Sequence, residues 1–239
     1  MDVNKVVLTG GSSGIGKEIN LFLLEKGYEV LFTYCHSADA AKEIEKNFAN
    51  AKAFQIDFTS NDQMDSFFEE IEAFSPDILI NNYYNGTFID TYFHKTEAEK
   101  ILNDFKNNVM PTLQVTQKCI TIFRKKKLGR IINILSSSMT SPAMGTSVYN
   151  SNKAYLLQMN KSWAIENVKF GITCNSVSPS FIPTDFHKNM DERLKETILS
   201  GYPLKEKLEG SDISGVINLC INGGKHFNGN HIFLDASHY

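Results

Sequence analysis

Short apolar runs alternate with amphipathic stretches along the whole chain. Val3–Thr9 is apolar and rich in β-branched residues, which predicts a strand, and Ile15–Lys26 has the apolar spacing of a helix that ends at Gly27. The same alternation continues to the end of the sequence. The other expected strands are Tyr28–Tyr34, Ala51–Ile56, Asp77–Ile80, Arg130–Leu135, Ile172–Val177 and His231–Leu234. The other expected helices are Ala38–Phe48, Asp62–Phe74, Glu97–Lys106, Pro111–Lys126, Val148–Asn167, Asp191–Leu199 and Asp212–Ile221.

This order of elements predicts the fold class. Nearly continuous apolar strands that alternate with helices are typical of a parallel sheet covered on both faces. Right-handed crossovers then give a doubly wound, Rossmann-type α/β fold. Because no linker, low-complexity segment or internal repeat interrupts the pattern, we expect residues 1–239 to form one dinucleotide-binding domain.

Composition narrows the function classes. The net charge is −3, with acidic and basic residues mixed along the chain, which argues against a nucleic-acid partner bound by bulk charge. No apolar run approaches the roughly 18 residues of a membrane span, and no signal peptide precedes the first strand. The four cysteines are far apart and lack zinc-ligand spacing, so we interpret them as reduced thiols of a cytoplasmic protein.

A glycine-rich turn, Thr9–Gly16, joins the first strand to the first helix. Gly10 and Gly14 can adopt positive φ, Gly16 allows close packing, and the free N–H groups of the helix can bind a phosphate. The G-x-x-x-G-x-G spacing differs from the usual dinucleotide fingerprint, and a plain tight turn is the alternative. Its place at the first strand–helix junction favours a cofactor site. The candidate contacts are Gly10, Ser12, Ser13, Gly14, Ile15 and Gly16.

A tyrosine and a lysine stand four positions apart in the long predicted helix Val148–Asn167. Tyr149 and Lys153 therefore share one helix face, and an ammonium near the phenol is expected to lower the tyrosine pKa. Ser136, which follows a predicted strand, can hydrogen-bond a substrate oxygen as charge develops on it, with Ser137 as the alternative. Either motif alone is commonly structural, as a surface pair or a loop. Together with the glycine-rich turn they indicate a catalytic site.

These motifs resemble the short-chain dehydrogenase/reductase family in order and spacing, from about Val3 to Asp235, with a layout similar to 3-oxoacyl-acyl-carrier-protein reductases. The resemblance implies a metal-free NAD(P)-dependent oxidoreductase, with Tyr149 as catalytic acid/base. It also implies that Lys153 holds the nicotinamide ribose and that Asn108 anchors a water chain for proton relay. Pro111 lacks an N–H, so a kink that frees polar groups is expected near Asn108. The other implied cofactor contacts are Asp57, Asn81, Pro179, Ile182 and Thr184.

The end of the second predicted strand bears on the choice of cofactor. NAD enzymes usually carry an acidic residue there, whereas this chain has none from Thr33 to Ser37. A 2′-phosphate avoids repulsion at such a site, and His36 and Ser37 can donate to it. We therefore expect NADP, with NAD as the alternative, although Ser13 stands where NADP-dependent relatives often have a basic residue.

The chain departs from the family at Tyr83 and Tyr84, which replace the small residues of an Asn-Asn-Ala-Gly motif. Because they follow a strand at the edge that faces the ligand crevice, we expect at least one ring to contact the substrate or cofactor site. The alternative is that both rings cover the next helix. Pro179-Ser180 and Asp235-Ala236-Ser237 are further departures, from Pro-Gly and Asp-Gly-Gly.

The expected activity is reduction of a carbonyl, or the reverse oxidation. A 3-oxoacyl thioester on a carrier protein is the first expectation, with Arg130, Lys127 and Lys169 able to attract an acidic carrier. A sugar, polyketide or other small carbonyl is the alternative substrate, and a non-catalytic dinucleotide sensor is the rival function. The family's association surface predicts a homodimer or homotetramer through Pro111–Lys126 and Val148–Asn167.

Overall fold

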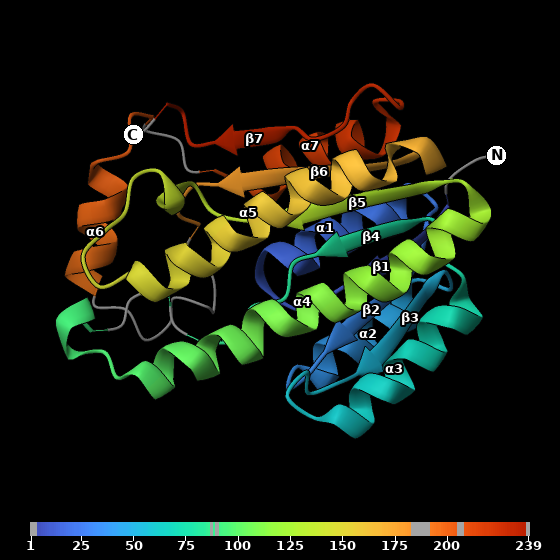
Figure 1. Ribbon diagram of the computed structural model, residues 1–239, viewed down its shortest axis with the longest axis horizontal. Helices are drawn as coiled ribbons and strands as arrows, with labels where there is room; N and C mark the ends of the chain where they lie inside the picture. The colour runs from blue at the N-terminus through green and yellow to red at the C-terminus, as the bar shows by residue number, and fades with distance from the viewer. Residues whose placement is uncertain (1–3, 87, 89–90, 183–191, 205–207, 238–239) are drawn as a thin grey trace.

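The computed structural model describes residues 4–86, 88, 91–182, 192–204 and 208–237 (Figure 1). The strands are β1 (Lys5–Leu8), β2 (Glu29–Tyr34), β3 (Ala51–Gln55), β4 (Ile78–Asn81), β5 (Gly129–Ile134), β6 (Ile172–Pro179) and β7 (His231–Leu234). The helices are α1 (Gly14–Glu25), α2 (Ala38–Asn47), α3 (Asn61–Phe74), α4 (Ala98–Lys126), α5 (Ser147–Asn167), α6 (Glu192–Ser200) and α7 (Gly210–Asn222). Three short 3₁₀ turns, which the sequence pattern did not predict, are η1 (Phe93–Lys95), η2 (Ser137–Met139) and η3 (Val168–Phe170).

The seven strands form one parallel sheet in the order β3-β2-β1-β4-β5-β6-β7. The chain builds outward from β1 to β3, then returns to the centre and builds the other way from β4. Helices cover both faces of this sheet, with α4 and α5 on the face toward the viewer in Figure 1. The predicted doubly wound α/β fold is therefore confirmed.

The core consists of two apolar layers, one on each face of the sheet. Val6 and Leu8 of β1 point into the layer beneath α1, α2 and α7, whereas Val7 between them points into the layer beneath α3, α4 and α5. This alternation follows from the period-two geometry of a strand. Because both faces are covered, the central strands β1, β4, β5 and β6 are buried at nearly every position.

Helix α4 corrects one prediction. The expected helices Glu97–Lys106 and Pro111–Lys126 are a single helix of 29 residues with Pro111 inside it. Proline removes only its own N–H from the helix, and here its ring is buried, so packing offsets the lost hydrogen bond. The Thr112 hydroxyl donates to the Asn108 carbonyl at 3.0 Å one turn back. The predicted break between residues 106 and 111 is therefore wrong.

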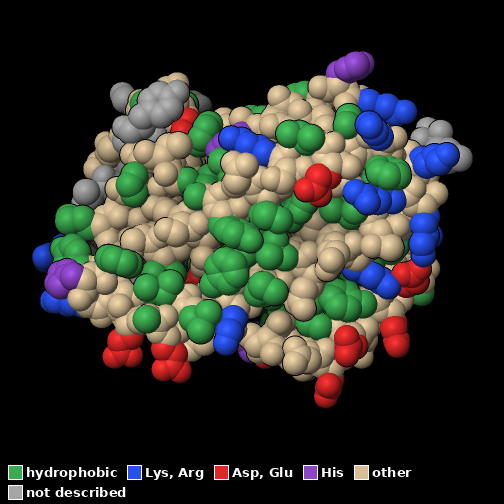
Figure 2. Space-filling model, viewed as in Figure 1, with side chains coloured by type: hydrophobic (Ala, Val, Ile, Leu, Met, Phe, Trp, Pro, Cys, Tyr) green, Lys and Arg blue, Asp and Glu red, His purple; other side chains and the backbone are tan. Residues whose placement is uncertain are grey.

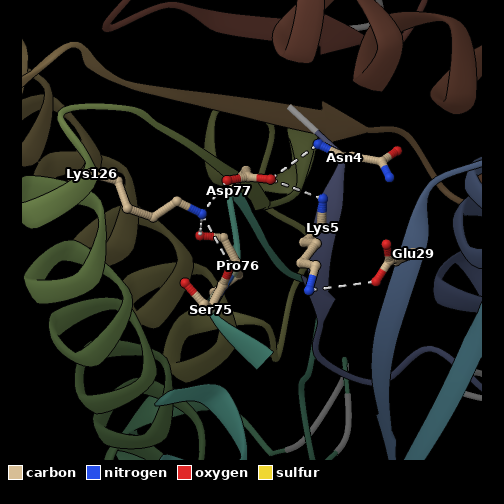
Figure 3. Close-up of polar contacts among 7 residues, drawn as sticks. All are labelled: Asn4, Lys5, Glu29, Ser75, Pro76, Asp77 and Lys126. Carbon is tan, nitrogen blue, oxygen red and sulfur yellow. Dashed lines mark hydrogen bonds and ion pairs between the residues drawn. The ribbon is translucent and has the colours of Figure 1, made fainter. Parts of the chain in front are cut away.

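The amino ends of β1 and β4 are joined around the Asp77 carboxylate (Figure 3). It accepts from the backbone N–H groups of Asn4 and Lys5, both at 3.1 Å, and forms an ion pair with Lys126 at the end of α4. Burial alone would raise the pKa of Asp77, but these hydrogen bonds hold it below its ordinary value. The cluster anchors the last turn of α4 to the edge of the sheet opposite the strands' carboxyl ends.

The basic residues expected to attract a carrier lie at this same edge. Arg130, the second residue of β5, is only 8% exposed, and its guanidinium donates to the backbone carbonyls of Ile221 and Gly129. Lys127 and Lys169 directly precede β5 and β6. The expectation that Arg130 attracts an acidic carrier is therefore wrong, because its guanidinium is buried and bonded to backbone carbonyls rather than accessible at the surface.

Within the described part of the chain, no helix combines the length and apolar character that crossing a membrane requires.

Candidate active site

A cavity of about 590 Å³ lies at the carboxyl ends of the strands. Its walls come from the segments that follow β1 to β6, together with the start of α5 and the part of the chain around α6. In an open parallel sheet, ligands bind in the crevice outside these strand ends, where the direction of winding changes. The glycine-rich turn and the Tyr149–Lys153 pair both line this cavity.

The backbone of the glycine-rich turn is fixed by hydrogen bonds from a neighbouring side chain. The Asn82 amide nitrogen donates to the carbonyls of Thr9 at 3.2 Å and Gly10 at 2.9 Å, and Gly10 has a φ of +70°. A Cβ at Gly16 would lie only 2.0 Å from the Gly10 carbonyl oxygen. The first helical residue is Gly14, and the Ser13 side chain does not cap the helix.

This cradle fits a pyrophosphate. The backbone approaches the cavity closely because Gly14 and Gly16 have no side chains, and the N-terminal N–H groups of α1 carry the positive end of the helix dipole. The six predicted contacts of the turn, Gly10, Ser12, Ser13, Gly14, Ile15 and Gly16, all line the cavity.

The adjoining part of the wall comes from the segments after β2 and β3. His36, Ser37 and Asp57 line the cavity as expected, and His36 is exposed. The Asp57 carboxylate accepts from the Thr59 N–H at 2.9 Å and the Thr59 hydroxyl at 2.7 Å, and these bonds lower its pKa. The Ser37 side chain makes no capping hydrogen bond to α2, so its hydroxyl is not used to cap that helix.

The catalytic candidates converge at the end of β5. The Ser136 and Tyr149 side chains both line the cavity, and Ser136 favours the ionised form of the phenol. The Ser138 hydroxyl lies 2.8 Å from that of Ser136 and donates to the Asn150 side-chain oxygen at 2.6 Å. Both serines weighed for this position line the cavity, and Ser136 is the one that influences the pKa of Tyr149.

The charge states differ from the expected ones. Lys153 is buried, its ammonium donates to the Ile134 carbonyl at 3.0 Å, and burial lowers its pKa to about 8. Burial raises the pKa of Tyr149 to about 12, against the opposing effect of Ser136. The prediction of a lowered tyrosine pKa is therefore wrong, because the loss of water outweighs the effect of Ser136. The neutral phenol that results is the form able to donate a proton.

Two predicted residues serve the scaffold around the cavity rather than its wall. Asn81 is buried, and its amide donates to Thr116 at 2.9 Å and Asn133 at 2.8 Å. Its neighbour Asn82 lines the cavity instead. A motif match places this pair only to within one residue, since adjacent residues at the end of a strand point in opposite directions.

Asn108 is also buried and is not part of the described cavity wall. Its side-chain oxygen accepts from the Asn85 N–H at 2.6 Å, and its amide donates to the Asp104 carbonyl at 3.1 Å and carboxylate at 3.2 Å. Pro179 and Ile182 line the cavity, as expected. Thr184 lies outside the described residues.

The two unusual tyrosines both line the cavity, which confirms that at least one ring reaches the site. The Tyr83 ring packs on Phe58 with centroids 4.4 Å apart, toward the end formed by β3. The Tyr84 ring meets the Tyr149 ring edge-on at 4.9 Å, and its hydroxyl donates to the Asp104 carboxylate at 2.8 Å. Sequence reasoning did not identify Asp104, because a single acidic residue within a helix carries no motif.

Comparison with known proteins agrees with this geometry. The profile of the short chain dehydrogenase family matches residues 4–195. A 3-oxoacyl-[acyl-carrier-protein] reductase of Staphylococcus epidermidis is 30% identical, with 99% of this chain and 100% of that protein covered. An acetoacetyl-CoA reductase of Shinella zoogloeoides is also 30% identical, with 88% of each protein covered.

The fold has close counterparts among solved structures. That of YwfH, described as an NADPH-dependent reductase involved in bacilysin biosynthesis, superposes with a TM-score of 0.89 at 20% identity, covering 100% of this chain and 99% of that one. Together with the family match over most of its length, these findings show that the chain belongs to the short chain dehydrogenase family of NAD(P)-dependent oxidoreductases.

Proposed function

We propose that this chain reduces an apolar carbonyl compound to an alcohol with NADPH, and that Tyr149 donates the proton. The observation that carries the proposal is that Ser136 and Tyr149 line the same cavity as the glycine-rich turn. A non-catalytic dinucleotide sensor on this fold has no need of such a pair. Reductive turnover with a carbonyl substrate distinguishes the two functions.

Each catalytic side chain has a distinct task in this mechanism. Ser136 hydrogen-bonds the carbonyl oxygen and stabilises the negative charge that develops on it. Tyr149 transfers its phenolic proton to that oxygen, and the nearby Lys153 ammonium stabilises the phenolate that remains. The chemistry that a bound NADPH supplies is a hydride for the carbonyl carbon.

The cofactor contacts are assigned from the cavity wall. We assign the pyrophosphate to the turn from Gly10 to Gly16 and the adenine to the neighbourhood of Asp57. The Asn82 amide holds the turn through its hydrogen bonds to the Thr9 and Gly10 carbonyls. Pro179 and Ile182 face the nicotinamide end in this assignment, and Lys153 holds the ribose. The residues named here, apart from Asn82, come from the set that the sequence predicted to bind the cofactor.

The remaining wall indicates the substrate class. Most of it is apolar or aromatic, and Lys153 is the charged residue of the described wall near Tyr149. Its apolar and aromatic members are Phe88, Pro142, Ala143, Phe181, Leu199, Tyr202 and Leu208, and its polar members are Ser137, Ser138, Ser141 and Ser180. Such a wall favours an acyl thioester, a polyketide or another apolar carbonyl over a sugar, whose hydroxyls need polar partners. The names of the two bacterial relatives, which describe reductases of 3-oxoacyl and acetoacetyl thioesters, agree with this class.

We expect NADPH to bind more tightly than NADH by roughly tenfold or more, because a hydrogen bond to a charged group contributes about 1.5 kcal/mol or more. No acidic residue stands from Thr33 to Ser37, and the exposed His36 lies at the cavity wall. Titrating intrinsic fluorescence with each cofactor measures the preference. His36→Ala should reduce this preference, while substitution of His226, which is also exposed but lies outside the cavity wall, by alanine should not. Tighter binding of NADH would contradict the assignment.

We also expect a homodimer or homotetramer that buries the surface of α4 and α5. Figure 2 shows apolar side chains gathered on the face where these helices lie. Met110 and Tyr155 are 38% and 41% exposed there, which is high for such residues. Light scattering at micromolar concentration should report the assembly, and Tyr155→Glu should shift it toward monomer. A monomeric wild-type chain would rule out this interface.

Two broader proposals follow from the same observations. All seven strands belong to one sheet, which supports a single dinucleotide-binding domain over residues 1–239. The four cysteines are free thiols, and Cys119, Cys174 and Cys220 are buried, which supports a cytoplasmic location.

A further inference from the structure

Asp104 of α4 is the meeting point of three side chains from different parts of the fold. One of its carboxylate oxygens accepts from the Tyr84 hydroxyl at 2.8 Å, from the Asn152 amide at 2.7 Å and from the Asn108 amide at 3.2 Å. Tyr84 follows β4 and Asn152 belongs to α5, so the carboxylate joins a loop at the cavity to the catalytic helix. Hydrogen bonds to a charged acceptor are the stronger kind, which makes this junction rigid.

The side chains joined by Asp104 flank the catalytic pair. The Tyr84 ring lies edge-on to the Tyr149 ring, with centroids 4.9 Å apart. The Lys153 ammonium lies 5.0 Å from the Tyr84 ring centroid and 5.8 Å from that of Tyr149. Asn152, which donates to Asp104, is adjacent to Lys153 in the sequence. One carboxylate thus fixes both the ring that contacts the ammonium and the turn of helix that carries it.

We propose that Tyr84, held by Asp104, is a positioning residue that keeps the Lys153 ammonium charged and the Tyr149 ring in place. The proposal rests on the proposed function, in which Lys153 and Tyr149 act on the substrate. Tyr84 occupies the position of the glycine in the family's Asn-Asn-Ala-Gly motif, so the family motif supplies no ring at this position.

The physical basis is the attraction between a cation and the face of an aromatic ring. Lys153 is buried and away from water, where this attraction is strongest. A phenol that donates a hydrogen bond to a carboxylate has a more electron-rich ring, which strengthens the attraction. Burial and the neighbouring Asp104 raise the pKa of Tyr84, so the ring stays a neutral phenol that donates to the carboxylate.

The other ionisable groups around Lys153 do not replace this contact. Tyr149 on its own helix is neutral, since burial raises its pKa to about 12. From β5 the ammonium meets a backbone carbonyl, that of Ile134. Among the described residues, Asp104 on α4 is the acid linked to this group, and it acts through Tyr84 and Asn152.

The pH profile of kcat/KM for carbonyl reduction tests the proposal. In the wild-type enzyme the activity should fall as pH rises through about 8, where Lys153 loses its proton. Tyr84→Leu removes the ring, so this falling limb should move to lower pH by roughly one unit, with a lower kcat at neutral pH. Tyr84→Phe keeps the ring but loses its bond to Asp104, so a smaller shift in the same direction is expected. Asp104→Asn should resemble Tyr84→Phe.

Tyr28→Phe is the matched control, because it deletes the hydroxyl of a half-buried tyrosine at the opposite edge of the sheet. It should leave the profile unchanged. If Tyr84→Leu melts at lower temperature but keeps the wild-type limb, Tyr84 is merely structural and the proposal fails. A shift in Asp104→Asn alone would also overturn it, because the carboxylate would then act without the ring. Failure of the proposed function looks different, since Tyr149→Phe would then retain normal turnover.

Discussion

Replacing Tyr149 with phenylalanine should lower turnover by roughly 10²–10⁴-fold, the usual contribution of a positioned general acid. The variant keeps the aromatic ring, and therefore its edge-on contacts with the rings of Tyr84 and Phe88, whose centroids lie 4.9 and 5.2 Å away. It loses only the phenolic hydroxyl, which is the proposed proton donor. Because the ring and the lysine remain, the fold and the affinity for NADPH should change little.

Steady-state oxidation of NADPH with a saturating carbonyl substrate measures this loss, and a fluorescence titration measures the cofactor affinity. Tyr28→Phe again serves as the matched control, since it lies outside the cavity wall. Turnover of Tyr149→Phe within a few-fold of the wild type would show that the proton comes from another group.

Gly16→Ala should abolish most cofactor binding. The new Cβ would lie 2.0 Å from the Gly10 carbonyl oxygen and 2.4 Å from the Asn82 amide nitrogen, so the turn must move. Forcing one extra methyl group into packed backbone costs about 1–3 kcal/mol or more. Since the displaced backbone is the proposed pyrophosphate cradle, we expect the affinity for NADPH to fall by at least tenfold or so.

Gly215→Ala is the control for this substitution. Gly215 lies within α7, and a Cβ there meets nothing within 4 Å. The change should therefore leave NADPH binding intact and stabilise the fold by about 0.5–1 kcal/mol, the helix preference for alanine over glycine. Thermal melting and NADPH titration of both variants separate a general loss of stability from a specific loss of cofactor binding at the turn. Wild-type affinity in Gly16→Ala would contradict the role of the turn.

The fold was predictable because the signals that specify it are local. Strands such as β4 are apolar at almost every position, and helices such as α1 are followed by a glycine, so each element could be found from its own residues. The error at α4 came from a local rule applied too strictly. Pro111 breaks a helix in isolation, but burial of the turn that contains it and of the segment that follows keeps this one continuous.

The site was predictable only as far as its motifs extend. Ser136, Tyr149 and Lys153 converge as their spacing indicated, because each stands at a fixed offset from the end of a strand or along a helix. The charge state of Tyr149 was not predictable, since its pKa depends on how much water the fold excludes. The contacts of Asp104 join residues 84, 108 and 152, which are far apart in the sequence, and no local pattern indicates such a junction.

The most direct test of the central claim is the consumption of NADPH by the purified chain with a panel of carbonyl compounds. The panel should hold 3-oxoacyl thioesters, apolar ketones and sugars, and each assay should be repeated with Tyr149→Phe. The account predicts oxidation of NADPH with an apolar carbonyl, formation of the matching alcohol, and little of either in the variant. Tight binding of NADPH without oxidation by any compound would contradict it and indicate a dinucleotide sensor.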